Sequence, residues 1–229
     1  VSPDGRRAFI VTRRADVATD VNWFEILLLD LDPGRLATGR FQEPRRLLSL
    51  PARRDQDYAV PAVQDARWVG NSKLVFLSSV RDAPMQVHAL DVATGELSQL
   101  TRSPHVIARF DVSTDLRRIV YVGQLPNPVA APGARSVVVA NHSFWSVKWG
   151  EHDLATQFRR YRYFLAEPGT GRRDVALGPE FHPGGLGPRG SVSPDGAWAV
   201  LPRDEPARQL ADHHRADRQH EHTGRGDVL

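Results

Sequence analysis

The chain has 229 residues, of which 41% are hydrophobic, and its 30 basic side chains nearly balance its 27 acidic ones. This composition suffices for a folded core and argues against a largely disordered chain. The absence of cysteine excludes disulfides, thiolate chemistry and cysteine zinc sites, and no apolar stretch is long enough to cross a bilayer. Because the arginines are interleaved with acids, we expect no nucleic-acid partner. Because no stretch can cross a bilayer, we expect a soluble protein without a membrane partner, and the absence of cysteine leaves both the cytoplasm and the periplasm open as its compartment.

The first unit opens with the turn phrase S-P-D-G at residues 2–5, which leads into an apolar run at residues 8–11. Proline presets φ at the second turn position, the aspartate bonds to nearby backbone, and glycine accepts a positive φ. The phrase therefore predicts a tight turn before a strand. The rest of the unit is predicted as a loop, a strand that ends in an acidic turn, a short strand and an exposed linker, at residues 13–20, 26–34, 46–50 and 51–64.

The same order of turn and strands returns twice in the middle of the chain. The second unit has a degenerate turn, an apolar run, a strand ending in D-V-A-T-G and a strand ending in L-T, at residues 68–73, 74–77, 87–95 and 97–101. The third unit has its turn and strands at residues 112–118, 119–122, 161–171 and 174–177. We expect Trp68, at the head of the second unit, to pack between neighbouring sheets.

Between the strands of the third unit lies the densest group of aromatic and titratable side chains in the chain. It follows a breaker-rich segment at residues 124–133 and an apolar run at 137–140, and it comprises His142, Phe144, Trp145, Lys148, Trp149, Glu151 and His152. Aromatic anchors beside charges suit a peptide-binding or docking surface. The same residues also suit an extra hairpin whose tryptophans fill space beside the sheet, and we favour this structural interpretation.

A fourth unit begins with S-P-D-G at residues 193–196 and the apolar run at 197–201, and strand periodicity then ends. The tail holds possible metal ligands in His213, His214, His220, Glu221 and His222. Their spacing matches no closed metal site, and no apolar residues would hold them rigid. We therefore interpret residues 205–229 as a disordered tail, read out of frame from a GC-rich coding sequence, of a truncated protein.

The repeated order of S-P-D-G turn, apolar strand, D-x-x-T-G strand and L-T strand resembles the propeller repeats of TolB-like proteins. It is also similar to the N-terminal propeller of serine peptidases of the prolyl-oligopeptidase type, a family that includes the bacterial lasso-peptide isopeptidases. The resemblance covers roughly the first nine-tenths of the chain. It implies an all-β fold, an incomplete β-propeller of about three and a half four-stranded blades.

The expected domain is a partial propeller at residues 1–204, with blades at about 1–50, 64–101, 105–178 and 189–204. Three and a fraction blades do not close a ring, so we expect open strand edges and open sheet faces.

The resemblance also bears on chemistry. In the resembled peptidases the catalytic Ser, Asp and His lie in an α/β-hydrolase domain after the propeller, and the propeller admits only short or threaded peptides. The nearest match here to the G-x-S-x-G nucleophile motif is Gly190-Ser191-Val192-Ser193-Pro194, which is the turn phrase itself. We therefore predict no catalytic residue, no cofactor and no metal site.

The expected function is that of a non-catalytic, peptide-gating propeller fragment whose hydrolase domain is absent. Its partners would be a peptide substrate or the missing α/β-hydrolase domain. The alternative is a TolB-like propeller that acts as a protein–protein interaction module. The least favoured hypothesis is an enzyme with a site among residues 142–152.

Overall fold

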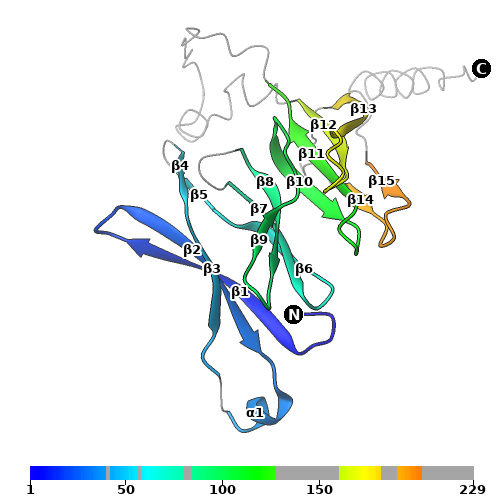
Figure 1. The fold of residues 1–229 in the computed structure, drawn as a ribbon. Coiled ribbons are helices and arrows are strands. Elements are labelled where there is room, and N and C mark those ends of the chain that lie inside the picture. The colour runs from blue at the N-terminus through cyan, green and yellow to red at the C-terminus, as the bar shows by residue number, and fades with distance from the viewer. Residues whose placement is uncertain (40–41, 56–57, 80–83, 127–159, 182–189, 203–229) are drawn as a thin grey trace, which may run out of the picture.

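The computed structural model describes residues 1–39, 42–55, 58–79, 84–126, 160–181 and 190–202. In these ranges the chain forms fifteen strands and one helix of five residues, α1 (Pro33–Ala37). The strands form antiparallel sheets that follow one another in chain order across Figure 1, from blue at the N-terminus to orange. No helix in the described residues is long and apolar enough to span a membrane.

Four of the five sheets in the described residues follow one another as the main body of the fold, and each is built from strands that are consecutive in sequence. The first sheet consists of β1 (Arg7–Asp16), β2 (Val21–Asp30) and β3 (Arg45–Pro51). The second consists of β6 (Gln64–Val69), β7 (Lys73–Ser78), β8 (Gln86–Asp91) and β9 (Leu97–Gln99). The third consists of β10 (Val106–Val112), β11 (Ile119–Gln124), β12 (Tyr161–Ala166) and β13 (Val175–Phe181). The fourth consists of β14 (Ser191–Val192) and β15 (Ala199–Val200).

The repeated turn lies between the first and second strands of the second, third and fourth sheets, and it precedes β1 in the first sheet. In all three S-x-D turns the serine hydroxyl donates to the aspartate two residues later, at 2.6 Å, and accepts a backbone N–H five residues later; the serines are Ser2, Ser113 and Ser193. Gly5 and Gly196 supply the positive φ, of 70° and 72°. In the third sheet Leu116 takes this position with φ 60°, a strained conformation for leucine, and its side chain packs against the core.

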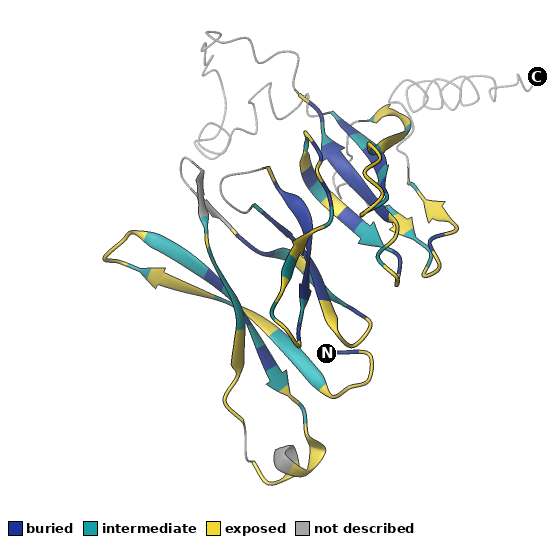
Figure 2. Cartoon of the chain, in the orientation of Figure 1, coloured by how far each residue is buried: buried dark blue, intermediate teal, exposed yellow. Residues whose placement is uncertain are grey.

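The core consists of three apolar clusters, one between each pair of neighbouring sheets. Figure 2 colours the middle strands of the second and third sheets largely as buried. In β7, Leu74 and Phe76 pack toward the first sheet, and Val75 and Leu77 pack toward the third. Both faces of this sheet are therefore buried, which explains why its strands are apolar without alternation. Within the described residues no cluster joins the first sheet to the fourth, so the sheets form an open arc. The fold is all-β and an incomplete β-propeller, as the sequence predicts.

A buried polar network holds the connection between β9 and β10, which joins the second sheet to the third. The side-chain oxygen of Gln86 accepts hydrogen bonds from the Thr101 hydroxyl and the Ser103 N–H, both at 2.9 Å. Its amide nitrogen donates to the Ser103 carbonyl at 3.0 Å. Thr101 also accepts the N–H of Val87 at 2.9 Å. This network gives a structural reason for the threonine at the end of the repeat's L-T strand.

Several details of the sequence prediction are wrong. Residues 13–16 are not loop but the end of β1, where Arg14 pairs with Trp23 and Asp16 with Val21. The first sheet has three strands and not four: its S-P-D-G turn directly precedes β1, which corresponds to the second strand of the other sheets, and no strand precedes the turn. The linker at residues 51–64 contains a small hairpin of β4 (Arg53–Asp55) and β5 (Tyr58–Val60). The predicted tail at residues 205–229 lies outside the described residues.

Candidate functional site

The first strands of three sheets, β6, β10 and β14, are joined side by side through their side chains. We call their shared surface the inner wall, because the first strands of propeller blades surround the central channel. An open pocket of about 360 Å³ lies on this wall, lined by Asp65, Arg67, Arg109, Phe110, Asp111, Gly190 and Ser191. The inner wall is the candidate functional site.

Two ion pairs link β6 to β10: in one the arginine lies on β10 and the aspartate on β6, and in the other the positions are reversed. Arg109 lies 2.8 Å from Asp65, and Arg67 lies 3.0 Å from Asp111. The first pair is 46% and 40% exposed, so it contributes at most about 1 kcal/mol to stability. The second pair is less exposed, because the Arg67 guanidinium lies 4.4 Å over the Phe110 ring and also donates to the Phe110 carbonyl at 2.9 Å.

Bulges in both strands direct these side chains. The register of β6 shifts between Gln64 and Arg67, and that of β10 shifts between Ile107 and Arg109. Asp65, inside the first bulge, has a φ of 50°, which aspartate tolerates better than most residues. Because a bulge turns side chains away from the regular alternation of a strand, it places Asp65 and Arg109 where they can meet.

The wall continues onto the fourth sheet through Asp111. One oxygen of its carboxylate binds Arg67, and the other accepts the backbone N–H of Val192 at 2.8 Å. The Nε of Arg67 is buried and has no hydrogen-bond partner among the described residues. The wall thus offers carboxylate acceptors, guanidinium donors and one aromatic ring, a set of groups that can hydrogen-bond both the N–H and the C=O groups of an extended peptide.

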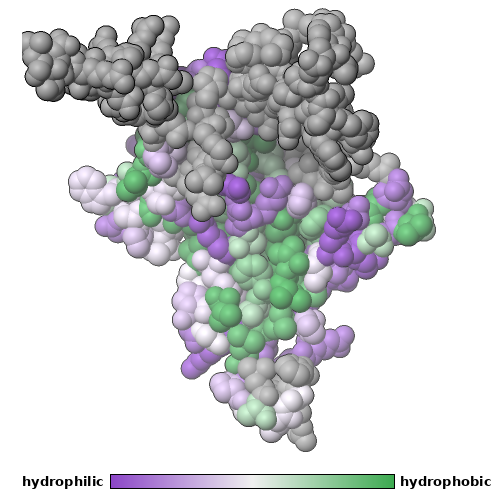
Figure 3. All heavy atoms as spheres, turned by 180° about the vertical axis from the view of Figure 1, so that it is seen from behind, coloured by the Kyte–Doolittle hydropathy of each residue, from purple (hydrophilic) through white to green (hydrophobic). Residues whose placement is uncertain are grey.

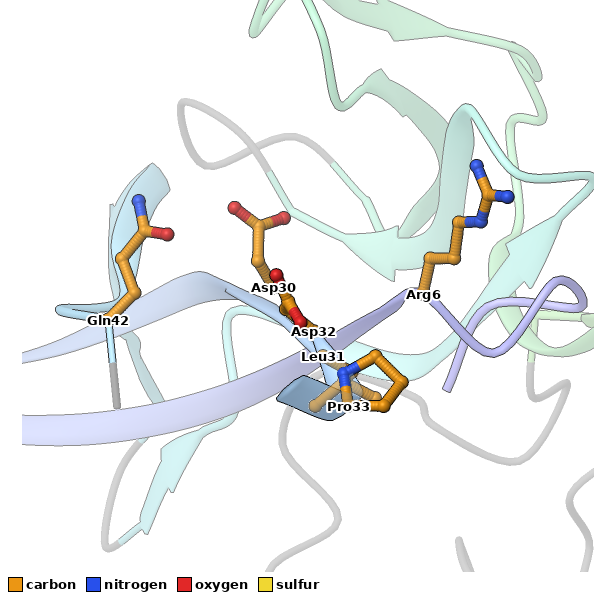
Figure 4. A pocket seen from close by; sticks show the side chains of 6 residues that line it. All are labelled: Arg6, Asp30, Leu31, Asp32, Pro33 and Gln42. Atoms are coloured by element: carbon orange, nitrogen blue, oxygen red, sulfur yellow. The ribbon is translucent and has the colours of Figure 1, made fainter. Parts of the chain in front are cut away.

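A second pocket, of about 400 Å³, lies at the end of β2 and beside α1. Figure 4 shows Asp30 and Arg6 pointing to the same side of the ribbon, with Gln42 beyond Asp30. Asp32 accepts the N–H of Gly34 at 2.8 Å, and Leu31 donates its N–H to the Arg6 carbonyl at 2.7 Å. These contacts connect the turn after β2 to the turn before β1, which indicates a structural role.

A third pocket, of about 410 Å³, lies between the second and third sheets, with Arg102 on one side and Glu167, Arg172 and Asp174 on the other. Glu167 is paired with Arg172 at 3.4 Å, and Asp174 accepts the hydroxyl of Tyr121 at 2.5 Å. Burial raises the pKa of Tyr121 well above its usual value, and the hydrogen bond to Asp174 raises this pKa further.

The segment that most nearly matches a nucleophile motif is a strand and a turn. Ser191 lies in β14 opposite Val200, and the Ser193 hydroxyl donates to Asp195. The cluster at residues 142–152 and the tail residues His213, His214, His220, Glu221 and His222 lie outside the described residues. In the part of the chain that is described, no group of three His, Asp or Glu side chains could hold a metal ion.

Sequence reasoning missed the inner wall, although a signal for it was present. The strands before the second and third turns carry D-A-R-W at residues 65–68 and R-F-D-V at residues 109–112. Opposite charges therefore occupy matching positions in neighbouring repeats. Once the repeats are placed side by side, this pattern predicts ion pairs between the first strands.

Comparison with known proteins finds similar solved structures but no matching family model and no matching curated protein. TolB from Acinetobacter baumannii is 18% identical with a TM-score of 0.47, over 89% of this chain and 36% of TolB. The acylaminoacyl peptidase of Pyrococcus horikoshii is 11% identical with a TM-score of 0.43, over 75% of this chain and 24% of the peptidase.

The β-propeller domain of the Trilobed protease from Pyrococcus furiosus is 13% identical with a TM-score of 0.41, over 79% of this chain and 42% of the domain. The chain thus spans about a third of TolB and a quarter of the acylaminoacyl peptidase. At these identities the similarity concerns the fold and not the chemistry. The solved structures similar to this chain include TolB-like propellers and propeller domains of S9 peptidases, and also the hydrazine synthase of Kuenenia stuttgartiensis.

Proposed function

We propose that this chain is the non-catalytic propeller part of a serine peptidase of the prolyl-oligopeptidase type, and that its inner wall guides peptides toward a hydrolase domain. The observation that carries the proposal is the inner wall itself. Three sheets present their first strands on one surface, and paired charges hold those strands together. The pocket on this surface is open, so an extended chain can lie along it.

The balance of charge on the inner wall supports a surface along which peptides move, rather than one that binds a peptide tightly. Asp65 and Asp111 are each matched by an arginine, so the wall has no excess charge that would hold one class of peptide. A peptide backbone can exchange hydrogen bonds with these groups as it moves, since each of them remains partly exposed. Selection would then depend on the size and the extension of the peptide.

Sequencing the coding DNA beyond residue 229, read in all frames, tests the link to a hydrolase. We expect an α/β-hydrolase sequence with a G-x-S-x-G motif. If no such sequence follows in any frame, the peptidase assignment is wrong, and a TolB-like interaction module becomes the better description.

Binding of fluorescein-labelled unstructured peptides, followed by anisotropy, tests the role of the wall. We expect weak binding that Arg109→Gln reduces, because this change removes the 2.8 Å pair with Asp65. The matched control is Arg160→Gln, which removes a pair of similar length, 2.7 Å to Glu180, at the β12–β13 edge of the third sheet. Equal effects of the two substitutions, or no peptide binding by the unaltered chain, would argue against a peptide-guiding wall.

A further inference from the structure

Among the residues that the structure describes, none covers one face of the first sheet. On this face Ile10 lies directly opposite Leu27, and Ala8 lies opposite Leu29. The other face of the same sheet, with Phe24, Ile26 and Leu28, packs against the second sheet. In the view of Figure 3 apolar side chains gather in a band that runs from the middle of the molecule toward the end that carries α1, over the first sheet. We call the face with Ile10, Leu27 and Leu29 the leading face.

The repeat shows what normally covers such a face. Ile10 follows Ser2 at the same spacing in sequence as Tyr121 follows Ser113, so the two residues hold matching positions. Tyr121 is 1% exposed because the second sheet packs on it, whereas Ile10 is 43% exposed. The natural occupant of the leading face is therefore another sheet of the same repeat.

The polar centre of the leading face is already neutralised. Glu25 lies on this face, 3.3 Å from Arg46 and 4.0 Å from Arg14, and its side chain is only 13% exposed. Because both arginines lie in the same sheet, a docking sheet would cover a paired carboxylate. Covering it would then cost much less than burying a lone charge.

The fourth sheet presents a second apolar surface that no other described residues cover, and β15 is coloured as exposed in Figure 2. Trp198 is 78% exposed and Val200 is 70% exposed, whereas Val192 and Leu201 pack against the third sheet. We call the surface of Trp198 and Val200 the trailing face. Trp198 holds the position of Arg7 and Arg118, which donate to backbone carbonyls in the turn of the following sheet, at 2.5 Å and 2.6 Å.

We propose that this chain associates head to tail with a second copy of itself, the trailing face of one copy packing on the leading face of the next. The argument rests on continuity with the interfaces inside the chain, since three sheet-to-sheet contacts already use the same positions. The two faces are different, so the contact is heterologous. It closes into a ring where the rotation allows and extends into a filament where it does not.

Sedimentation velocity of the full chain between about 1 and 100 μM measures this association. We expect the mass to rise with concentration. Trp198→Arg, which restores the arginine of the repeat, and Ile10→Lys should each raise the concentration of half-association by at least about tenfold. The control is Val17→Lys, which changes a 92% exposed apolar residue in the β1–β2 turn, outside both faces, and should leave association intact.

Mixing the two impaired variants gives the sharpest test. The Trp198→Arg chain keeps an intact leading face and the Ile10→Lys chain keeps an intact trailing face, so an equimolar mixture should form dimers at concentrations where either variant alone is monomeric. A monomeric unaltered chain at every concentration would overturn the proposal. So would a mixture that stays monomeric, or an equal loss of association with Val17→Lys. The far-ultraviolet circular dichroism of each variant establishes that it is folded.

Discussion

Replacing Gln86 by leucine tests whether the buried polar network stabilises the second sheet. Gln86 is 3% exposed, and its amide satisfies the Thr101 hydroxyl, the Ser103 N–H and the Ser103 carbonyl. Leucine has a similar volume and is more apolar, so hydrophobic burial alone predicts that the variant is more stable. The network predicts the opposite, because the substitution removes the hydrogen bonds that the Thr101 hydroxyl and the Ser103 N–H donate and the one that the Ser103 carbonyl accepts.

The expected magnitude follows from these three groups. An unsatisfied buried donor or acceptor costs about 1–3 kcal/mol, and the apolar side chain returns about 1–2 kcal/mol. Taking about 1.5 kcal/mol for each of the three lost hydrogen bonds, we expect Gln86→Leu to lower the free energy of unfolding by about 3 kcal/mol. Gln124→Leu is the control, a half-buried glutamine on β11 whose change should stay within about 0.5 kcal/mol.

Urea unfolding followed by tryptophan fluorescence gives both free energies. A double-mutant cycle with Thr101→Val adds a second measurement, and the coupling between the two sites should be about 1–2 kcal/mol because they share a hydrogen bond. A Gln86→Leu chain as stable as the unaltered one, or additive effects in the cycle, would refute this reasoning.

The remaining predictions concern turns, packing and pH. Ser113→Ala should lower the urea midpoint more than Ser193→Ala, because the first serine is fully buried and water can replace the contacts of the second. Hydrogen bonds to the Asp115 carboxylate hold its pKa below the ordinary value of 3.8; the bond from the Ser113 hydroxyl has the larger effect and the bond from the Arg117 N–H the next. This stabilisation is complete above pH 3.8 and is lost as the pH falls through the lowered pKa, so Asp115→Asn should flatten the acid limb of a plot of midpoint against pH. Gly123→Ala should lower the melting temperature by an amount equivalent to about 1–3 kcal/mol, since a Cβ there would lie 2.9 Å from the Phe164 ring. The raised pKa of Tyr121 stabilises the folded chain fully below pH 10 and progressively less above it, so Tyr121→Phe should remove part of the alkaline loss of stability seen in the same urea series.

The sequence predicted the parts of the fold that depend on local chemistry. The S-x-D turns form where the serine, the aspartate and the residue with positive φ occur together. Trp68 packs between the first and second sheets, with its ring centroid 5.9 Å from that of Phe9, as its place at the head of the second unit indicated. The apolar runs at residues 74–77 and 119–122 are strands buried on both faces. In each case a few adjacent residues determine the outcome.

The missed features depend on partners that are distant in sequence or on the backbone alone. Arg13 and Arg14 suggested a loop, but the strand they belong to is held by pairing with β2 and needs no apolar face at that end. The inner wall joins residues about forty positions apart, and bulges decide which side chains meet. Asp65 illustrates the difficulty, since its charge is visible in the sequence and its backbone conformation is not.

The pairing of each strand with its neighbours in sequence has a consequence for how such a molecule grows and breaks. The strands of each sheet pair only with strands that are next to them in sequence. The described part of the chain therefore behaves as a one-dimensional array of modules, each module being one sheet. A module can be gained or lost at either end without rethreading those that remain. The two terminal modules, each supported on one side only, should open before the central pair.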